Sequence, residues 1–153
     1  MIGKDGAPKV LEYNCRFGDP ETQPIMMRLT SDLAEACVAV LDGNASSVQL
    51  KWDPRVALGV VIASGGYPSN YDKGHPISGL DNTRIDDAYV FHAGTAIHNN
   101  AVVNSGGRVL CVVGLGDTVS QAQQVAYARV DEISFDGAFC RRDIGHRAVA
   151  REA

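Results

Sequence analysis

Aliphatic side chains follow one another almost without interruption over residues 56–64, which predicts a strand buried on both faces. This strand would end in the turn sequence GGYP. A second strand is expected over residues 89–93. Residues 101–103 and 107–115 predict a hairpin that turns at residues 104–107, where an asparagine, a serine and two glycines follow one another. The pattern therefore predicts a sheet in this part of the chain.

Two segments carry apolar side chains at the three- and four-residue spacing of amphipathic helices. The first covers residues 31–41, and Gly43 suits the end of a helix. Asp117 or Thr118 would cap the second helix, which would continue to Asp131. Its apolar face would consist of Val119, Ala122, Val125, Ala126 and Val130.

Both ends of the chain show short, weaker signals. Residues 9–16 predict a strand that follows a turn at residues 4–8, and residues 17–23 predict a loop because of their glycine and proline. Because only Met1-Ile2-Gly3 precede the turn, we expect the chain to be a piece of a longer protein. Short strands are also expected at residues 133–135 and 139–140.

Helical and extended patterns occur in one chain, which predicts an α/β (α+β) protein. A polar connection over residues 43–54 separates two units, so we expect domains at residues 1–50 and 51–153. The second domain would contain a small mixed sheet of roughly four or five strands.

Composition narrows the class of protein. The chain has 153 residues, of which 45% are hydrophobic and 21% charged, as in an ordinary soluble globular protein. A net charge of −4 argues against a general nucleic-acid binder. No apolar run reaches the roughly 20 residues of a membrane span, and the N-terminus lacks the apolar stretch of a signal peptide, so a cytoplasmic protein is expected. Four cysteines without a C-x-x-C pair predict reduced core or loop residues.

Candidate chemistry begins with Glu12, Asn14 and Arg16, which would share one face of the predicted N-terminal strand. A carboxylate and an amide oxygen suit a hard cation such as Mg²⁺, which bridges to phosphate oxygens. The arginine could bind the same phosphate or a developing acyl phosphate. The alternative is a solvated polar face of an edge strand.

Further candidates lie in loops. Asp19 and Glu21 could hold an ammonium group or orient the neighbouring arginine, although such residues also simply build turns. Gly65 and Gly66, at the end of a buried strand, allow a ligand to approach the backbone, and Lys73 follows soon after. A phosphate could therefore meet backbone N–H groups and one lysine there. The alternative is a simple connecting turn.

The C-terminal segment concentrates arginine in an otherwise acidic chain. Arg141 and Arg142, with Arg147 nearby, suit bidentate phosphate recognition, and a solvated charge cluster is the alternative. Gly114 and Gly116 do not make a dinucleotide fingerprint, because Val119 stands where a third glycine is required.

Taken together, these segments resemble the phosphoribosylamine–glycine ligase family, also called glycinamide ribonucleotide synthetase. The resemblance rests on several motifs that follow one another in the family's order. They are LEYNCRFGDPETQ at residues 11–23, ASGGYP at 63–68, FHAGT at 91–95, GGRVLCV at 106–112 and RRDIGHRA at 141–148. The resemblance covers essentially the whole chain. It implies the end of an ATP-grasp domain followed by a small C-terminal domain.

The resemblance also implies a reaction and the residues that serve it. ATP, glycine and 5-phosphoribosylamine would give glycinamide ribonucleotide, ADP and phosphate in purine synthesis. Glu12 and Asn14 would hold Mg²⁺, or Mn²⁺, between the ATP phosphates, and Arg16 would face the acyl phosphate. The substrate-binding residues would be Asp19, Glu21, Gly65, Gly66, Lys73, Arg141 and Arg142.

The family's N-terminal domain and nucleotide-binding lysines are not in this sequence. We therefore expect the missing N-terminal portion of the ligase to be a partner and the isolated chain to be inactive. We also expect self-association through Val10, Tyr13 and the Met26-Met27 pair, which would have lost their packing partner. Two alternatives remain open: a non-catalytic phosphoribosyl-ligand binding or assembly module that acts with a separate N-terminal chain, and an ATP-grasp ligase with another substrate.

Overall fold

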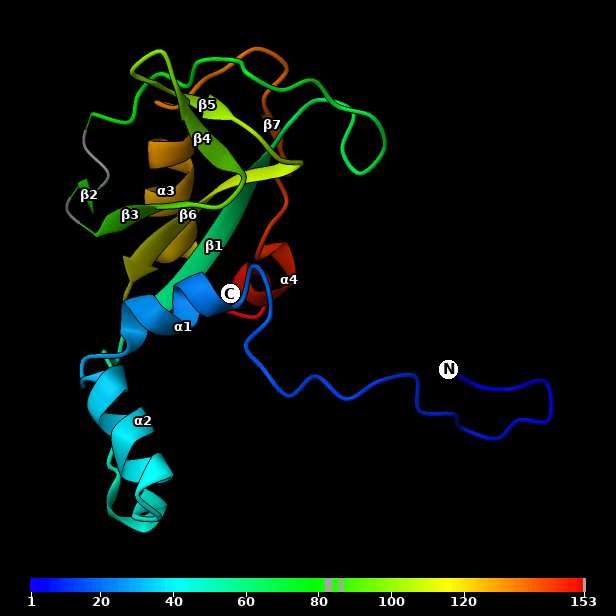
Figure 1. The fold of residues 1–153 in the computed structure, drawn as a ribbon, viewed down its shortest axis with the longest axis vertical. Coiled ribbons are helices and arrows are strands. Elements are labelled where there is room, and N and C mark those ends of the chain that lie inside the picture. The colour runs from blue at the N-terminus through cyan, green and yellow to red at the C-terminus, as the bar shows by residue number, and fades with distance from the viewer. Residues whose placement is uncertain (82–83, 86, 153) are drawn as a thin grey trace.

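The computed structural model describes residues 1–81, 84–85 and 87–152. Its main element is a five-stranded sheet with the order β2-β3-β6-β1-β7 (Figure 1). The strands of this sheet are β1 Val56–Ala63, β2 Arg84–Ile85, β3 Ala88–His92, β6 Arg108–Gly116 and β7 Phe139–Cys140. The expected strand at residues 56–64 and the one at 89–93 are thus confirmed, each within one residue at its ends.

The sheet is built around β6, which pairs with β1 on one side and with β3 on the other. Val112 in β6 lies opposite Val60 and Val90, and all three side chains are buried. Every pairing between named strands in the described residues is antiparallel. The expected fold class, helices combined with a small sheet, is confirmed.

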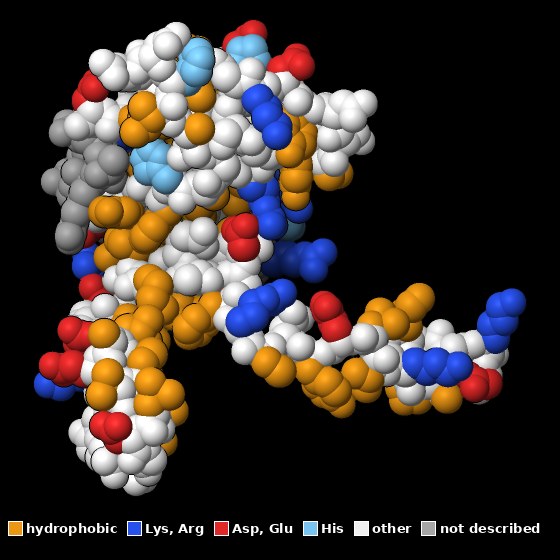
Figure 2. Space-filling model, in the orientation of Figure 1, with side chains coloured by type: hydrophobic (Ala, Val, Ile, Leu, Met, Phe, Trp, Pro, Cys, Tyr) orange, Lys and Arg blue, Asp and Glu red, His pale blue; other side chains and the backbone are white. Residues whose placement is uncertain are grey.

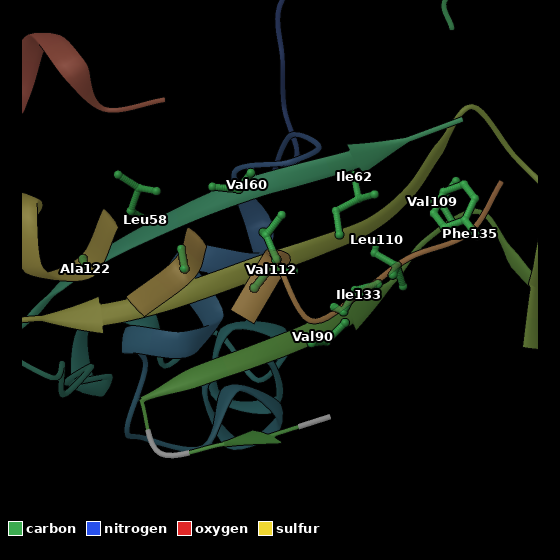
Figure 3. Close-up of a cluster of buried hydrophobic side chains, with 12 residues drawn as sticks. Leu58, Val60, Ile62, Val90, Val109, Leu110, Val112, Ala122, Ile133 and Phe135 are labelled. Atoms are coloured by element: carbon green, nitrogen blue, oxygen red, sulfur yellow. The ribbon is translucent and has the colours of Figure 1, made fainter. Parts of the chain in front are cut away.

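Helix α3, Val119–Val130, covers one face of this sheet (Figure 1). Its N-cap is Thr118, whose side chain accepts a hydrogen bond from the Gln121 amide, as expected. The close-up in Figure 3 shows the core between helix and sheet, where aliphatic side chains from β1, β3 and β6 meet. The core includes Leu58, Val60, Ile62, Val90, Val109, Leu110, Val112, Ala122, Ala126, Val130, Ile133 and Phe135.

The opposite face of β1 is only partly covered. Gly59 and Val61 alternate with the core residues and are half-buried, so the prediction of full burial on both faces was wrong. Helix α1, Thr22–Arg28, packs there, with Pro24 against the backbone of Gly59. The sequence does not predict α1, because residues 17–23 indicate a loop and Pro24 follows them directly.

Residues 1–21, the segment before α1, form an arm that extends away from the sheet (Figure 1). Residues 1–9 make a tight turn closed by backbone hydrogen bonds such as Lys9 N–H to Met1 O, at 2.8 Å. The strand predicted at residues 9–16 is absent from this described segment. A strand needs a neighbouring strand to pair its backbone groups, and residues 9–16 have none in the described chain.

Helix α2, Leu33–Leu41, also projects from the body of the molecule (Figure 1). Asp32 caps it by accepting hydrogen bonds from the Ala34 and Glu35 amides. The helix predicted at residues 31–41 is thus confirmed. A short 3-10 helix, Ala45–Ser47, follows it.

The predicted hairpin between residues 101–103 and 107–115 was wrong. Strand β5, Ala101–Asn104, pairs instead with β4, Thr95–His98, in a separate two-stranded sheet. The turn between them consists of Asn99 and Asn100, both with positive φ. Near the C-terminus, β7 confirms the strand predicted at 139–140. Residues 133–135 contribute only an isolated bridge, Ser134 to Ser78, before the short helix α4, His146–Val149.

Burial divides the chain unevenly. Among the described residues, the first buried one is Leu58, and the hydrophobic core extends from there to Phe135. The arm and α2 therefore lie outside the core. Within the residues the structure describes, no helix is long and apolar enough to cross a membrane.

Candidate functional site

The connection after β1 contains the Gly65-Gly66 loop, and it is exposed at the end of the sheet. Gly66 has φ +92°, and a Cβ there would lie 2.0 Å from the Asn70 carbonyl oxygen, so glycine is required. The loop is joined to the sheet at its start by a hydrogen bond from Ser64 N–H to Gly107 O, at 2.8 Å.

Arg108, at the start of β6, connects the base of the arm to this end of the sheet. Its guanidinium lies 3.0 Å from a carboxylate oxygen of Asp19 and donates to the Asp19 carbonyl at 3.2 Å. The neighbouring Gly107 packs against the rings of Tyr67 and Tyr71 in the glycine loop. Asp19 and the loop, 46 or more residues apart in sequence, therefore converge at the start of β6. Sequence reasoning did not assign Arg108, because only the strand pairing brings it to Asp19.

The arm carries the predicted metal ligands. Glu12, Asn14 and Arg16 are all exposed, and none of their side chains makes a hydrogen bond or ion pair within the described residues. Their expected placement on one face of a strand is not realised, because the segment is not a strand. A carboxylate and an amide oxygen open to solvent nevertheless have the donor chemistry that Mg²⁺ prefers.

No group of three or more histidine, cysteine, aspartate or glutamate side chains in the described part of the chain is close enough to hold a metal ion. If Mg²⁺ bound at Glu12 and Asn14, these two residues would provide two oxygen ligands, and the other positions would fall to phosphate oxygens or water. All four cysteines are free. Cys111 is a core residue and Cys15 lies in an irregular segment, as expected, whereas Cys37 is exposed on α2. Burial raises the pKa of the Cys111 thiol to about 12.

The two acidic residues of the following loop have local partners. Glu21 accepts a hydrogen bond from the Gly18 amide at 2.8 Å, so it helps to close a turn at the start of α1. Asp19 is paired with Arg108. These contacts agree with the turn-building alternative for Glu21, and they join Asp19, at the base of the arm, to β6.

A small cavity of about 210 Å³ lies beside the glycine loop. It is lined by Gly65, Asp72, His75, Asp136 and Gly137. The His75 imidazole lies 3.8 Å from the Asp136 carboxylate. Lys73 is exposed, and its ammonium group lies 5.7 Å from the centre of the Tyr71 ring. The loop thus offers backbone and one cation to a ligand at its rim, beside an acidic wall.

The C-terminal arginines are paired with carboxylates. Arg141 donates to both carboxylate oxygens of Asp143, at 2.9 and 2.7 Å, and this pairing lowers the pKa of Asp143. Arg142 lies 2.6 Å from Asp131, and its guanidinium sits 5.5 Å above the Tyr127 ring. The charges of Arg141 and Arg142 are therefore balanced locally in the folded protein.

Tyr127 fixes the backbone on which these arginines sit. Its hydroxyl donates to Arg141 O at 2.7 Å and accepts from the Ile144 amide at 3.1 Å. Partial burial raises the pKa of this hydroxyl, so it remains a donor. The arginine segment is thereby held against α3.

A larger cavity, of about 690 Å³, lies between α1 and the start of β1. Its lining combines aromatic and aliphatic side chains with two arginines. The lining residues are Phe17, Pro24, Ile25, Arg28, Trp52, Pro54, Arg55, Val56 and Ala57. The sequence did not predict this cavity, because it did not predict α1.

Comparisons with known proteins identify the family of this chain. The family described as phosphoribosylglycinamide synthetase, C domain, matches residues 57–147. The phosphoribosylamine–glycine ligase of Allochromatium vinosum is 60% identical over 152 residues, which are 99% of this chain and 36% of that protein. The ligase of Vibrio cholerae is also 60% identical, and the match covers 35% of its length.

A solved structure agrees with these sequence matches. The crystal structure of phosphoribosylamine–glycine ligase from Thermotoga maritima superposes with a TM-score of 0.69 at 36% identity, over 94% of this chain and 35% of that one. The chain thus spans about a third of the length of the relatives it matches. Because the matched family covers more than half of its residues, the chain belongs to the family of the phosphoribosylglycinamide synthetase C domain.

Proposed function

We propose that this chain supplies the end of the ATP-grasp domain and the C-terminal domain of a phosphoribosylamine–glycine ligase. That enzyme would join glycine to 5-phosphoribosylamine with ATP, giving glycinamide ribonucleotide, ADP and phosphate in cytoplasmic purine synthesis. The observation that carries the proposal is the 60% identity over 152 residues, which includes the arm as well as the sheet.

The proposed division into residues 1–50 and 51–153 has two supports. The family match begins at residue 57, and the first buried residue is Leu58. The remaining N-terminal portion of the ligase would be the partner of the arm. Because the chain corresponds to 36% of the Allochromatium ligase, we expect it not to turn over by itself.

In this proposal Glu12 and Asn14 hold Mg²⁺ or Mn²⁺, and Arg16 faces the acyl phosphate. The cation, when bound, neutralises charge on the ATP phosphates. The two oxygen donors are exposed and can therefore turn toward a ligand without breaking an existing contact. Arg16 has a similarly exposed guanidinium, which suits an anionic intermediate.

The phosphoribosyl group would bind at the glycine loop and the C-terminal arginines. Gly65 and Gly66 would offer backbone N–H groups, and Lys73 would offer a cation. Arg141 and Arg142 are exposed in ion pairs, which at a surface are worth about 0–1 kcal/mol, so a phosphate can replace the carboxylates. Asp19 and Glu21 would shape the substrate side of the arm.

A chimeric enzyme tests the proposal. This chain would replace the matching 36% of the Allochromatium vinosum ligase, and ADP release would be measured with glycine and 5-phosphoribosylamine. We expect an active chimera. Glu12→Gln should lower kcat/KM at least about 100-fold, because it removes a charged metal ligand. Glu35→Gln, at an exposed residue of α2, is the matched control and should leave activity unchanged.

The outcome separates the competing functions. A folded but inactive chimera, together with calorimetric binding of ribose 5-phosphate by this chain alone, would favour a non-catalytic binding or assembly module. Activity with another amine or acid would indicate a different ATP-grasp ligase. ADP release by the isolated chain would contradict the proposed need for the N-terminal portion.

A further inference from the structure

Asn104 is a polar residue inside the molecule, at the end of β5. Only 1% of its surface is exposed, and Ser64 beside it is equally buried. A buried amide costs free energy unless its donors and acceptor are satisfied. The hydrogen-bond partners of Asn104 therefore indicate its structural role.

All the partners belong to the connection that carries the glycine loop, or to its start. The side-chain amide nitrogen donates to the Ser64 hydroxyl at 2.9 Å and to the Asp72 carbonyl at 2.8 Å. The side-chain oxygen accepts from the His75 amide at 2.8 Å. Because a carbonyl can only accept and a backbone N–H can only donate, these partners fix which end of the amide is nitrogen.

Ser64 connects Asn104 to the backbone at the start of the loop through two hydrogen bonds. Having accepted from Asn104, its hydroxyl donates to Gly106 O at 2.9 Å. The backbone of Asn104 closes the other end, since its N–H donates to His75 O at 3.1 Å and its carbonyl accepts from Gly74 N–H at 2.9 Å. One residue thus joins both ends of the loop that runs from Ser64 to His75, which Figure 1 shows reaching out beyond β1.

We propose that Asn104 is a positioning residue for phosphoribosyl binding. It fixes the conformation of the loop that carries Gly65, Gly66 and Lys73. This inference rests on the proposed function for the identity of the ligand. Asn104 itself is buried beneath the loop and need not touch the substrate. Its loss would let the two ends of the loop move independently, so the backbone N–H groups would no longer converge on a phosphate.

The isosteric variant Asn104→Asp separates positioning from packing. It keeps the oxygen that accepts from His75 N–H but replaces the donor to Asp72 O by a carboxylate oxygen, which repels that carbonyl. In the chimeric ligase, we expect the KM for 5-phosphoribosylamine to rise about tenfold, since one positioned contact set is lost. The KM for ATP should change less than about twofold, because Asn104 makes no hydrogen bond to Glu12 or Asn14, the residues proposed to hold the metal.

Val90→Ala is the control for a merely structural effect. Val90 is 1% exposed in β3 and belongs to the core, so its truncation lowers stability without touching the loop. If Val90→Ala raises the KM for 5-phosphoribosylamine as much as Asn104→Asp does, the inference is overturned. The same holds if all substrate KM values rise together.

Amide hydrogen exchange of the 153-residue chain provides a readout that does not depend on ligase activity. We expect the Gly74 and His75 amides to exchange faster in Asn104→Asp than in Val90→Ala. Their acceptors on residue 104 remain, but the lost hydrogen bond to the Asp72 carbonyl lets the adjoining segment open more often. Unchanged exchange would refute the positioning role. An inactive wild-type chimera with faster exchange in Asn104→Asp would instead place the failure in the proposed function.

Discussion

Asp53 lies between α1 and β1 and receives hydrogen bonds from two arginines. Arg55 donates to both of its carboxylate oxygens, with the shortest distance 2.7 Å, and Arg28 donates to its carbonyl at 3.1 Å. A carboxylate oxygen of a second residue, Asp87, lies 2.6 Å from a guanidinium nitrogen of Arg55. The side-chain hydrogen bond from Arg55 lowers the pKa of Asp53 from 3.8 to about 2. This carboxylate therefore favours the folded state whenever it is ionised.

Asp53→Asn should lower the free energy of unfolding at pH 7, because it removes the ionised partner of Arg55. The folded-state pKa is lower than the unfolded one, so the contribution is complete above about pH 4 and disappears as the pH falls to about 2. Urea unfolding of both proteins from pH 7 to pH 2 measures it. A difference that stays constant over this range would contradict the assignment, and Asp42→Asn, at an exposed residue after α2, is the control.

At the scale of elements, local signals were enough where the sequence carries its own cap. Thr118, one of the two caps predicted for α3, caps that helix, Asp32 caps α2, and the aliphatic run of β1 identified its strand. Pairing was less predictable, because it depends on residues far apart. The hairpin turn was predicted at the glycine-rich residues 104–107, but it lies at Asn99 and Asn100. The glycines instead lead into β6.

The residues of the candidate site were also easier to predict than their contacts. The residue types in the arm and the glycine loop could be selected from sequence, since their chemistry is visible in the side chains. Their partners could not, because Arg108 meets Asp19 and Asn104 meets Ser64 only through the pairing of β6 and the path of the loop. The carboxylates that balance Arg141 and Arg142 include Asp131, which lies beyond the end of α3.

The contact between α3 and β6 depends on small residues. A Cβ on Gly114 would lie 2.4 Å from the carbonyl oxygen of Ala122 and 2.6 Å from the amide nitrogen of Ala126. Gly114→Ala must therefore displace the helix backbone, and we expect it to lower the free energy of unfolding by about 3 kcal/mol. Denaturant unfolding measures the change.

Gly59→Ala is the matched control for Gly114→Ala, since both replace a strand glycine. At Gly59 the new Cβ would meet a ring carbon of Pro24 at 3.0 Å, a side chain that can shift with α1. We expect a clearly smaller loss of stability. Equal losses would show that the helix backbone is not what makes Gly114→Ala costly.

The whole molecule combines a packed body with two projecting parts. The core lies between Leu58 and Phe135, whereas the arm and α2 carry apolar side chains that remain in solvent. Figure 2 shows these apolar side chains along both projections, beyond the mixed surface of the body. Val10 is 66% exposed, Leu11 73% and Tyr13 81%. Met26 and Met27, which were grouped with them from the sequence, are half-buried in α1 instead.

Apolar surface of this extent favours association, because burying it removes it from water. We predict that the 153-residue chain self-associates through the arm and that its sedimentation coefficient rises with concentration. The double variant Leu11→Ser, Tyr13→Ser should reduce this rise, since it removes two exposed apolar groups from one segment. Ile97→Ser, at a residue 81% exposed on β4 in the body, should leave it unchanged. A wild-type chain that sediments as a monomer at every concentration would show that the arm does not drive association.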